Sequence, residues 1–266
     1  LEANTYLAPW NTKQASCWPF NTAVIFIAGK DITLRNLTIE STAGPGYLAG
    51  QALAVYAAAD RLSCYNCRFT GWQDTIFNGD PMTCNMKKLM LPDFFQASEV
   101  PIVHKFYRNY FKDCYVCGDV DYIFGPNTAF FDHCEIHSIA RVSEGKAYIT
   151  AASTPAGQEF GLVFSHCRIT GEEPDSVYLG RPWRDCAKTA FICCELGDHI
   201  CPEGWQNWGK VRAEVLSDYI EYGNFGPGAD CSGRSPLSRC LVNPEVETYF
   251  SKENVLAGED GWIPAE

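Results

Sequence analysis

The chain has 266 residues, of which 46% are hydrophobic and 14% aromatic, a composition that can fill a large core and excludes a disordered chain. Its formal net charge of −11 repels phosphate backbones and argues against nucleic acid as a partner. No run of about 18 apolar residues occurs, so we expect no membrane-spanning segment. The chain begins with Leu1 and shows no leader, which fits either a truncated chain or one that has lost a signal peptide.

From residue 35 onward, short β-branched or aromatic segments alternate with turn residues. Each contains an Asn or Cys, a spacer, an apolar residue, a second spacer and a small or polar end: RNLTIES (35–41), YNCRFTG (65–71), KDCYVCG (112–118), DHCEIHS (132–138), SHCRITG (165–171) and ICCELGD (192–198). With Asn36, Cys67, Cys114, Cys134, Cys167 and Cys194 taken as equivalent, the spacings are 31, 47, 20, 33 and 27 residues. This variable spacing predicts solenoid coils that carry loops of different length.

The architecture that fits best is an all-β parallel β-helix, in which equivalent inward-facing residues stack from coil to coil. The repeat cysteines then form an internal ladder of buried thiols, because a free Cys packs like a small hydrophobe. The C-x-x-C pairs Cys64/Cys67 and Cys114/Cys117 would in isolation suggest zinc or redox chemistry, but the repeat explains them better, and we expect all fourteen cysteines to titrate as thiols. Near the C-terminus, residues 244–256 predict a short helix. Its apolar stripe consists of Val246, Tyr249 and Phe250.

Three segments follow or end repeat strands and do not fit a purely structural role: GWQDTI (71–76), GDVDYIFG (118–125) and LGRPWR (179–184). In a β-helix they would project from neighbouring coils onto one face. Asp121 lies among apolar residues, where a carboxylate is costly unless it is paired, and Arg181 is the natural partner. A single Asp at a strand end is usually a turn or cap residue, but these segments in combination favour a catalytic site.

Together with GQALA (50–54), the segments QDT (73–75), DYIFG (121–125) and LGRPW (179–183) resemble the four signature segments of the pectin methylesterases, in the family's order. The resemblance covers residues 22–208 of the chain. It implies a right-handed, single-stranded parallel β-helix that de-esterifies methylated galacturonan to pectate and methanol. The four segments are specific in combination, whereas Gln-Asp-Thr alone would be weak.

The resemblance assigns Asp121 as the nucleophile that attacks the methyl-ester carbonyl and forms an acyl-enzyme. Arg181 would orient Asp121 and keep it ionised, because a nearby opposite charge lowers a carboxyl pKa. Asp74 would be the general acid that protonates the leaving methoxide and then the base that activates water, which requires a raised pKa. Gln51 and Gln73 would donate hydrogen bonds to the developing oxyanion.

The resemblance also implies a substrate-binding role for Trp183, Phe124 and Arg181, with the two rings presenting apolar faces to the sugar. For Trp183, the alternative is a core residue. The expected partner is a methylated polygalacturonan or oligogalacturonide, and we expect a monomer without cofactor or metal. The five histidines accompany no Gly-x-Ser-x-Gly motif, so a serine-hydrolase triad has no support, and no His or Cys spacing indicates a metal site.

Two features depart from the family pattern. The usual Gly-x-Tyr-x-Glu segment before Gln51 is absent, so we expect the N-terminal coils to be missing or replaced within a single domain over 1–266. The spacing of 47 residues from Asp74 to Asp121 exceeds one coil, which predicts an inserted loop at 80–105, rooted beside the active site. This loop either walls the cleft and favours short oligomers over polymer, or packs on an adjacent coil.

Several alternatives stay open from the sequence. Another β-helix enzyme of pectin breakdown could use Asp74 and Asp121 as glycosidase carboxylates, or Asp119 and Asp121 in a calcium-dependent lyase, although the Gln donors and Arg181 suit an acyl centre better. An inactive carbohydrate-binding β-helix would keep the fold without turnover. Localisation is open too: polymeric pectin suggests secretion, whereas the cysteine content slightly favours an intracellular protein.

Overall fold

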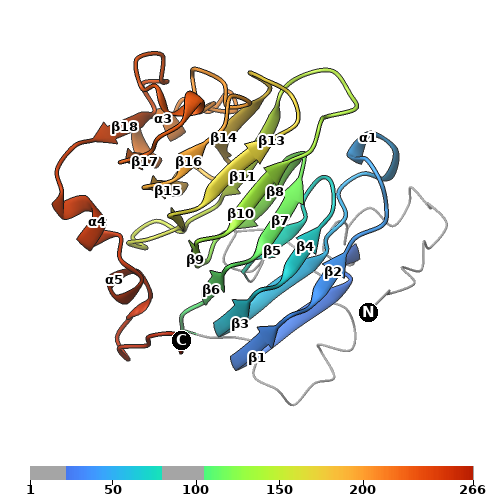
Figure 1. Ribbon diagram of the computed structural model, residues 1–266. Helices are drawn as coiled ribbons and strands as arrows, with labels where there is room; N and C mark the ends of the chain where they lie inside the picture. Colours follow the sequence, from blue (N-terminus) through green and yellow to red (C-terminus); the bar gives the residue numbers. More distant parts are fainter. Residues whose placement is uncertain (1–21, 80–104, 266) are drawn as a thin grey trace.

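The computed structural model describes residues 22–79 and 105–265, and their strands form a coiled, parallel array (Figure 1). Every described strand pairing is parallel, and each strand pairs with the equivalent strand of the neighbouring coil. The described helices are short, and none of them is long and apolar enough to cross a membrane. The prediction of an all-β parallel β-helix is confirmed.

The coil is built from two sheets, and the larger sheet forms two of its walls. The 12-stranded sheet contains β1 (Ile25–Arg35), β3 (Val55–Tyr65), β5 (Ile76–Asn78), β6 (Arg108–Lys112), β8 (Val120–Gly125), β9 (Thr128–Asp132), β11 (Ala147–Ala152), β12 (Leu162–Ser165), β14 (Val177–Pro182), β15 (Lys188–Ile192), β17 (Asp218–Tyr222) and β18 (Ser238–Leu241). The 6-stranded sheet contains β2 (Thr38–Glu40), β4 (Arg68–Thr70), β7 (Tyr115–Gly118), β10 (Glu135–Ser138), β13 (Arg168–Gly171) and β16 (Glu195–Leu196). The long strand β3 pairs with β5 through its first half and with β6 through its second, so the larger sheet forms two walls.

Inside the coil, side chains of one kind stack from turn to turn. The predicted ladder thiols are all buried: Cys67, Cys114, Cys134, Cys167 and Cys194. The backbone N–H groups of Cys67 and Cys114 donate to the Sγ atom of the next ladder cysteine at 3.5 and 3.4 Å. The ladder prediction is therefore confirmed. A second column was not predicted and consists of Phe111, Phe131, Phe164 and Phe191, whose ring centroids lie 4.6, 4.7 and 4.5 Å apart.

A residue with a left-handed backbone precedes the 6-stranded sheet in each coil. These residues are Asn36, Asn66, Asp113, His133, His166 and Cys193, with φ between 49° and 56°. Asn, Asp and His tolerate this conformation better than most residues. Asn66 Nδ2 donates to Asn36 Oδ1 at 2.8 Å, and Thr38 pairs with Arg68. Leu37, not Asn36, is therefore the counterpart of Cys67, and the predicted register was wrong by one residue in the first coil.

The predicted C-terminal helix is two short helices, α4 (Glu245–Tyr249) and α5 (Lys252–Leu256), separated where Ser251 caps the second. Of the predicted apolar stripe, Val246 and Phe250 are buried in an apolar layer outside the coil, whereas Tyr249 is 45% exposed. The other helical segments in the described part of the chain are α1 (Gly46–Ala49), α3 (Ala213–Leu216) and the 3-10 turn η3 (Pro227–Ala229).

Cys231 and Cys240 form a disulfide, and the other ten described cysteines are free thiols. The prediction that all fourteen cysteines are thiols is wrong for this pair, because the turn between η3 and β18 brings the two residues together. The predicted insertion at 80–105 lies outside the described residues except for Lys105, as do its expected effects on polymer access.

Candidate active site

Asp74 and Asp121 occupy equivalent positions on adjacent coils. Strand β5 pairs with β8 so that Ile76 lies opposite Ile123, which places the aspartates two positions earlier beside each other. Both have a left-handed backbone, with φ of 67° and 50°. Strand β8 also carries one residue more than β11 at this point, a β-bulge. Bulges and positive φ values at non-glycine residues are concentrated at functional sites, where they redirect side chains.

Arg181, near the end of β14, reaches across β11 to Asp121. Its Nε and Nη2 atoms donate to the two carboxylate oxygens of Asp121 at 2.8 and 2.6 Å, so the predicted pairing is present. The rings of Tyr148 and Trp208 pack against the guanidinium, with their centroids 3.9 and 3.7 Å from its central carbon. A bidentate, stacked arginine has little freedom to rotate, so it fixes the direction of the Asp121 carboxylate.

The pKa values of the two aspartates are raised unequally. Asp74 is 2% exposed, and its Oδ1 atom has no hydrogen-bond partner among the described residues. Burial and then the charge of Asp121 raise the pKa of Asp74 well above its usual range, against the smaller lowering effects of Arg181 and Gln51. Burial also raises the pKa of Asp121, although Arg181 opposes it through hydrogen bonds and charge. The expected lowering of the Asp121 pKa below its usual value does not occur. The pKa of Asp74 is raised further than that of Asp121, so Asp74 holds its proton more tightly.

Gln51 and Gln73 flank Asp74. The Gln51 side chain lowers the pKa of Asp74 through a hydrogen-bonding interaction, which places its amide next to the carboxyl group. The Gln73 side chain packs against the backbone of Gly46 at the start of α1, where an added Cβ would lie 2.5 Å from Gln73 Oε1. Both glutamines are partly exposed. Gln51 therefore lies next to the Asp74 carboxyl group, whereas the oxyanion role expected for both glutamines stays a prediction.

A row of side chains leads along the outside of the larger sheet to Arg181. In register from strand to strand these residues are Phe26, Tyr56, Phe77, Phe124, Ala151 and Arg181. Trp183 packs on the row with its ring centroid 5.6 Å from that of Phe124 and 6.3 Å from that of Phe77. Phe124 is 4% exposed, so it supports Trp183 and does not present its own face to solvent, in contrast to the expected sugar contact. Trp183 is partly exposed and can offer that contact.

Sequence reasoning missed Tyr148, Trp208 and Lys210. Lys210 Nζ donates to the backbone oxygens of Pro182 and Trp183 at 2.5 and 3.1 Å and lies 4.4 Å from the centroid of Trp208. Its charge lowers the pKa of Asp121. The aromatic and basic character of the segment WQNWGK (205–210) was the available signal.

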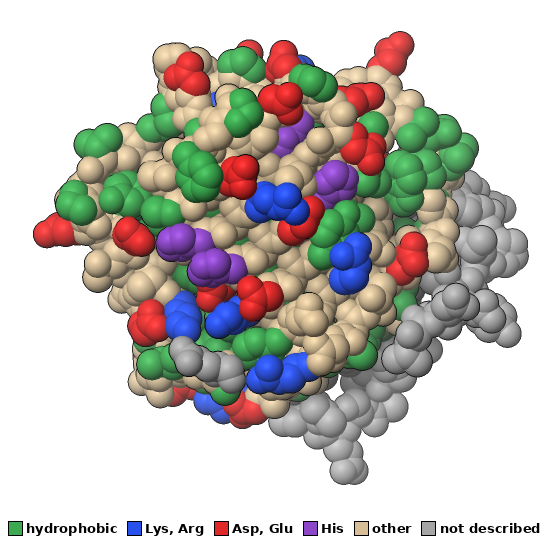
Figure 2. Space-filling model, in the orientation of Figure 1, with side chains coloured by type: hydrophobic (Ala, Val, Ile, Leu, Met, Phe, Trp, Pro, Cys, Tyr) green, Lys and Arg blue, Asp and Glu red, His purple; other side chains and the backbone are tan. Residues whose placement is uncertain are grey.

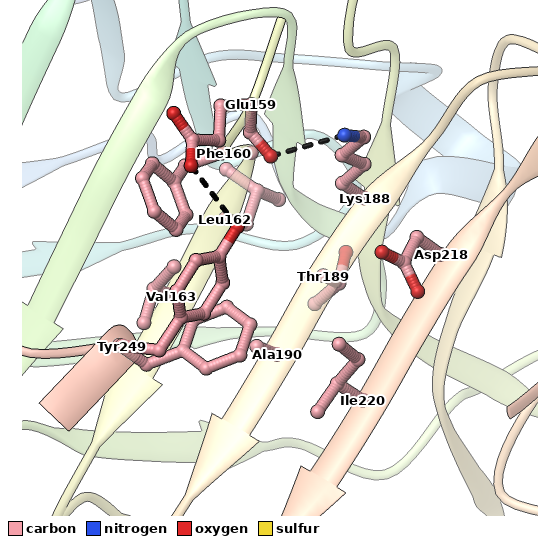
Figure 3. A pocket seen from close by; sticks show the side chains of 12 residues that line it. Glu159, Phe160, Leu162, Val163, Lys188, Thr189, Ala190, Asp218, Ile220 and Tyr249 are labelled. Carbon is pink, nitrogen blue, oxygen red and sulfur yellow. Dashed lines mark hydrogen bonds between the residues drawn. The ribbon is translucent and has the colours of Figure 1, made fainter. Parts of the chain in front are cut away.

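A separate pocket lies on the larger sheet between β12, β15 and β17, next to α4 (Figure 3). Lys188 Nζ donates to the Glu159 backbone oxygen at 3.0 Å, and the Tyr249 hydroxyl donates to Glu159 Oε1 at 3.1 Å (Figure 3). No predicted site residue lines this pocket. It is not the candidate active site.

Adjacent aspartates on neighbouring coils, one of them bound by an arginine, define a candidate catalytic site on a parallel β-helix. The family model described as Pectinesterase matches residues 3–80 and 96–259, so the chain belongs to the pectinesterase family. The match extends beyond the expected 22–208 on both sides. It omits 81–95, which lie inside the segment where an insertion was predicted.

Curated and solved relatives agree with this assignment. The chain is 36% identical to pectinesterase 31 of Arabidopsis thaliana over 91% of this chain and 66% of that relative. The pectin methylesterase from carrot superposes with a TM-score of 0.74 at 26% identity, covering 93% of this chain and 73% of the carrot chain. A pectin methylesterase solved in complex with a hexasaccharide superposes with a TM-score of 0.67 at 26% identity, covering 92% of this chain and 74% of that chain. The chain spans less than two thirds of the length of the curated relatives it matches.

Proposed function

We propose that the chain hydrolyses galacturonosyl methyl esters of pectin or of methylated oligogalacturonides to free carboxylates and methanol. One observation carries the proposal: a buried carboxyl group, Asp74, lies beside an arginine-bound carboxylate, Asp121, on the adjacent coil, and one Asp74 oxygen has no hydrogen-bond partner within residues 22–79 and 105–265. Membership of the pectinesterase family supports the same reaction class. The hexasaccharide complex of a structural relative supports an oligosaccharide substrate.

In the first half of the reaction, a carboxylate oxygen of Asp121 attacks the ester carbonyl carbon and forms a tetrahedral oxyanion. The amide N–H groups of Gln51 and Gln73 are available to stabilise that oxyanion, and a single such donor contributes about 2.7–4 kcal/mol in measured enzymes. The oxyanion then collapses, the bond to methoxide breaks, and protonated Asp74 gives its proton to the methoxide. Methanol leaves, and the galacturonosyl group stays on Asp121 as an anhydride.

In the second half, Asp74 is ionised and acts as a base. It takes a proton from a water molecule whose oxygen attacks the galacturonosyl carbonyl carbon of the anhydride. The bond to Asp121 breaks, the carboxylate of Asp121 is restored, and Asp74 is again protonated. The unequal pKa values match these roles. Asp74, which must be protonated at the start, has the pKa that is raised further of the two.

Arg181 acts by position and charge. Its bidentate contact leaves the carboxylate of Asp121 in one orientation while the anhydride forms and breaks. Trp183, partly exposed above Phe124 and Phe77, offers an apolar ring face to the sugar next to the reacting ester. We expect the substrate carboxylates to be mostly esterified where they meet the protein, because its net charge of −11 repels a demethylated polymer.

The test is methanol release from highly methylated pectin and from a methylated oligogalacturonide, with and without a chelator. We expect release from at least one substrate, unchanged by the chelator, and no shortening of the chains. Chain cleavage without methanol would indicate a glycosidase or lyase and contradict the proposal. Binding of the oligomer without any turnover would indicate a carbohydrate-binding β-helix.

A further inference from the structure

Three metal-ligating side chains from separate elements meet on the outside of the coil, away from the aspartates: His166, Cys193 and Glu247. One ring nitrogen of His166, the Sγ atom of Cys193 and one carboxylate oxygen of Glu247 all lie within 4.8 Å of one another. His166 lies in the turn after β12, Cys193 in the turn after β15, and Glu247 in α4. We propose that these three side chains bind a divalent zinc ion.

The β-helix itself brings the first two ligands together. His166 and Cys193 hold the same left-handed turn position on consecutive coils, with φ of 54° and 53°. The His166 backbone N–H donates to the backbone oxygen of Ile192, directly before Cys193, at 2.9 Å. Because a whole coil separates the two residues in sequence, no short metal-binding motif exists. This is why the sequence alone predicted no metal site.

The third ligand comes from the C-terminal segment. Val246 and Phe250 of this segment are buried against the apolar layer on the outside of the coil, which fixes α4 over the turns. This packing aims Glu247 at His166, with 3.7 Å between Glu247 Oε1 and His166 Nε2. A bound metal would therefore link the C-terminal helix to two consecutive coils.

Hydrogen bonding orients the histidine for a metal. His166 Nδ1 lies 2.9 Å from the Ser165 hydroxyl oxygen. When Nδ1–H donates to this oxygen, the lone pair of Nε2 is directed at Glu247 and Cys193. Metal-ligating histidines almost always donate their other ring N–H to a neighbouring group in this way, and loss of that group typically costs about 10- to 100-fold in metal affinity.

The thiol is kept accessible by a glycine. Gly223 takes the same turn position in the next coil, with φ of 63°, and a Cβ atom added there would lie 3.0 Å from Cys193 Sγ. A larger residue would crowd the sulfur. Cys193 is accordingly only partly buried, whereas its neighbour Cys194 is a fully buried ladder thiol.

The donor set selects the ion. Thiolate, imidazole and carboxylate together are typical of zinc, whereas calcium and magnesium prefer oxygen ligands alone. Three protein ligands leave the fourth tetrahedral position to water. On binding, the Cys193 thiol gives its proton to solvent, and small side-chain rotations bring the three donor atoms to about 2.0–2.3 Å from the metal. Figure 2 shows histidine side chains lying side by side on the exposed surface. The His133 ring stacks on the His166 ring, with 5.1 Å between their centroids.

The experiment uses the full chain and titrates it with Co²⁺ as a spectroscopic substitute for zinc. Thiolate-to-cobalt charge-transfer absorption and the visible bands of tetrahedral Co²⁺ report the ligands, and added Zn²⁺ should abolish both. The test variants are Cys193→Ser and His166→Asn, because asparagine occupies this turn position at Asn36 and Asn66 and preserves its backbone. The matched controls are His133→Asn, at the same turn position one coil earlier, and Cys186→Ser, another partly buried thiol.

We expect one equivalent of Co²⁺, loss of the charge-transfer band in Cys193→Ser, and affinity at least about tenfold weaker in His166→Asn. His133→Asn and Cys186→Ser should bind as the wild type does. Zn²⁺ should raise the unfolding temperature of the wild type but not of Cys193→Ser. No cobalt spectrum in the wild type, an unchanged spectrum in Cys193→Ser, or equal weakening by His133→Asn and His166→Asn would each overturn the proposal.

Discussion

Removing the positive charge beside Asp121 tests the electrostatics of the site. In Arg181→Met, Asp121 stays buried but loses the hydrogen bonds of 2.8 and 2.6 Å. Burial then raises the pKa of Asp121 without the hydrogen bonds and the charge of Arg181 that oppose it in the wild type. Because attack on the ester requires ionised Asp121, the acidic limb of the kcat/KM profile should move to higher pH.

The same substitution should also destabilise the fold by an amount that depends on pH. The side chains of Arg181 and Asp121 are 15% and 7% exposed, and removing one partner of such a buried pair costs about 3–5 kcal/mol. This cost applies where Asp121 is ionised. In the variant, the folded pKa of Asp121 lies above its unfolded value, so the folded state binds the proton more tightly and the free energy of unfolding decreases as pH rises.

The assays are methanol release against pH and denaturant unfolding at two pH values. Arg212→Met is the matched control, because Arg212 is 80% exposed and pairs with Asp185 at 3.4 Å, an interaction worth at most about 1 kcal/mol. The control should leave both the pH profile and the stability nearly unchanged. An acidic limb that stays in place in Arg181→Met, or that moves equally in Arg212→Met, would refute this reasoning.

Three further outcomes follow from the structure. Asp74→Asn should lower methanol release at least about a hundredfold, because positioned acid–base groups contribute about 10²–10⁴ in rate; retention of more than a tenth would exclude that role. Trp208→Ala removes the ring on Arg181, a contact worth about 0.5–2 kcal/mol, and should reduce kcat/KM severalfold; no change would show that the ring does not matter. Phe164→Ala should cost about 3–5 kcal/mol in denaturant unfolding, whereas the 92% exposed Val242→Ala should be neutral; similar values for both would contradict the stacked core.

The parts of the structure that follow from repetition could be predicted from the sequence. A cysteine recurs once per coil at the same inward position, so the residue pattern itself shows that Cys67, Cys114 and their equivalents stack. The pairing of Asp121 with Arg181 also followed from the sequence, because a carboxylate among apolar residues requires a partner.

The rest depends on contacts between coils that the sequence does not encode locally. Asp74 and Asp121 both have positive φ values, and they lie together because of the register of β5 against β8. The stacking of Trp208 on Arg181 joins segments from different coils. Phe124 was expected to face the sugar, but it is buried and its ring packs against that of Trp183. Each of these features requires knowledge of which residues lie opposite one another.

The most direct test of the central claim is methanol release by Asp121→Asn on methylated pectin, beside wild-type protein of matched purity. Asparagine keeps the shape of the side chain but is not a nucleophile, so the fold and substrate binding should persist. We predict that the rate falls by at least about a thousandfold. A variant that is correctly folded and keeps a tenth or more of the wild-type rate would show that Asp121 does not form the acyl-enzyme.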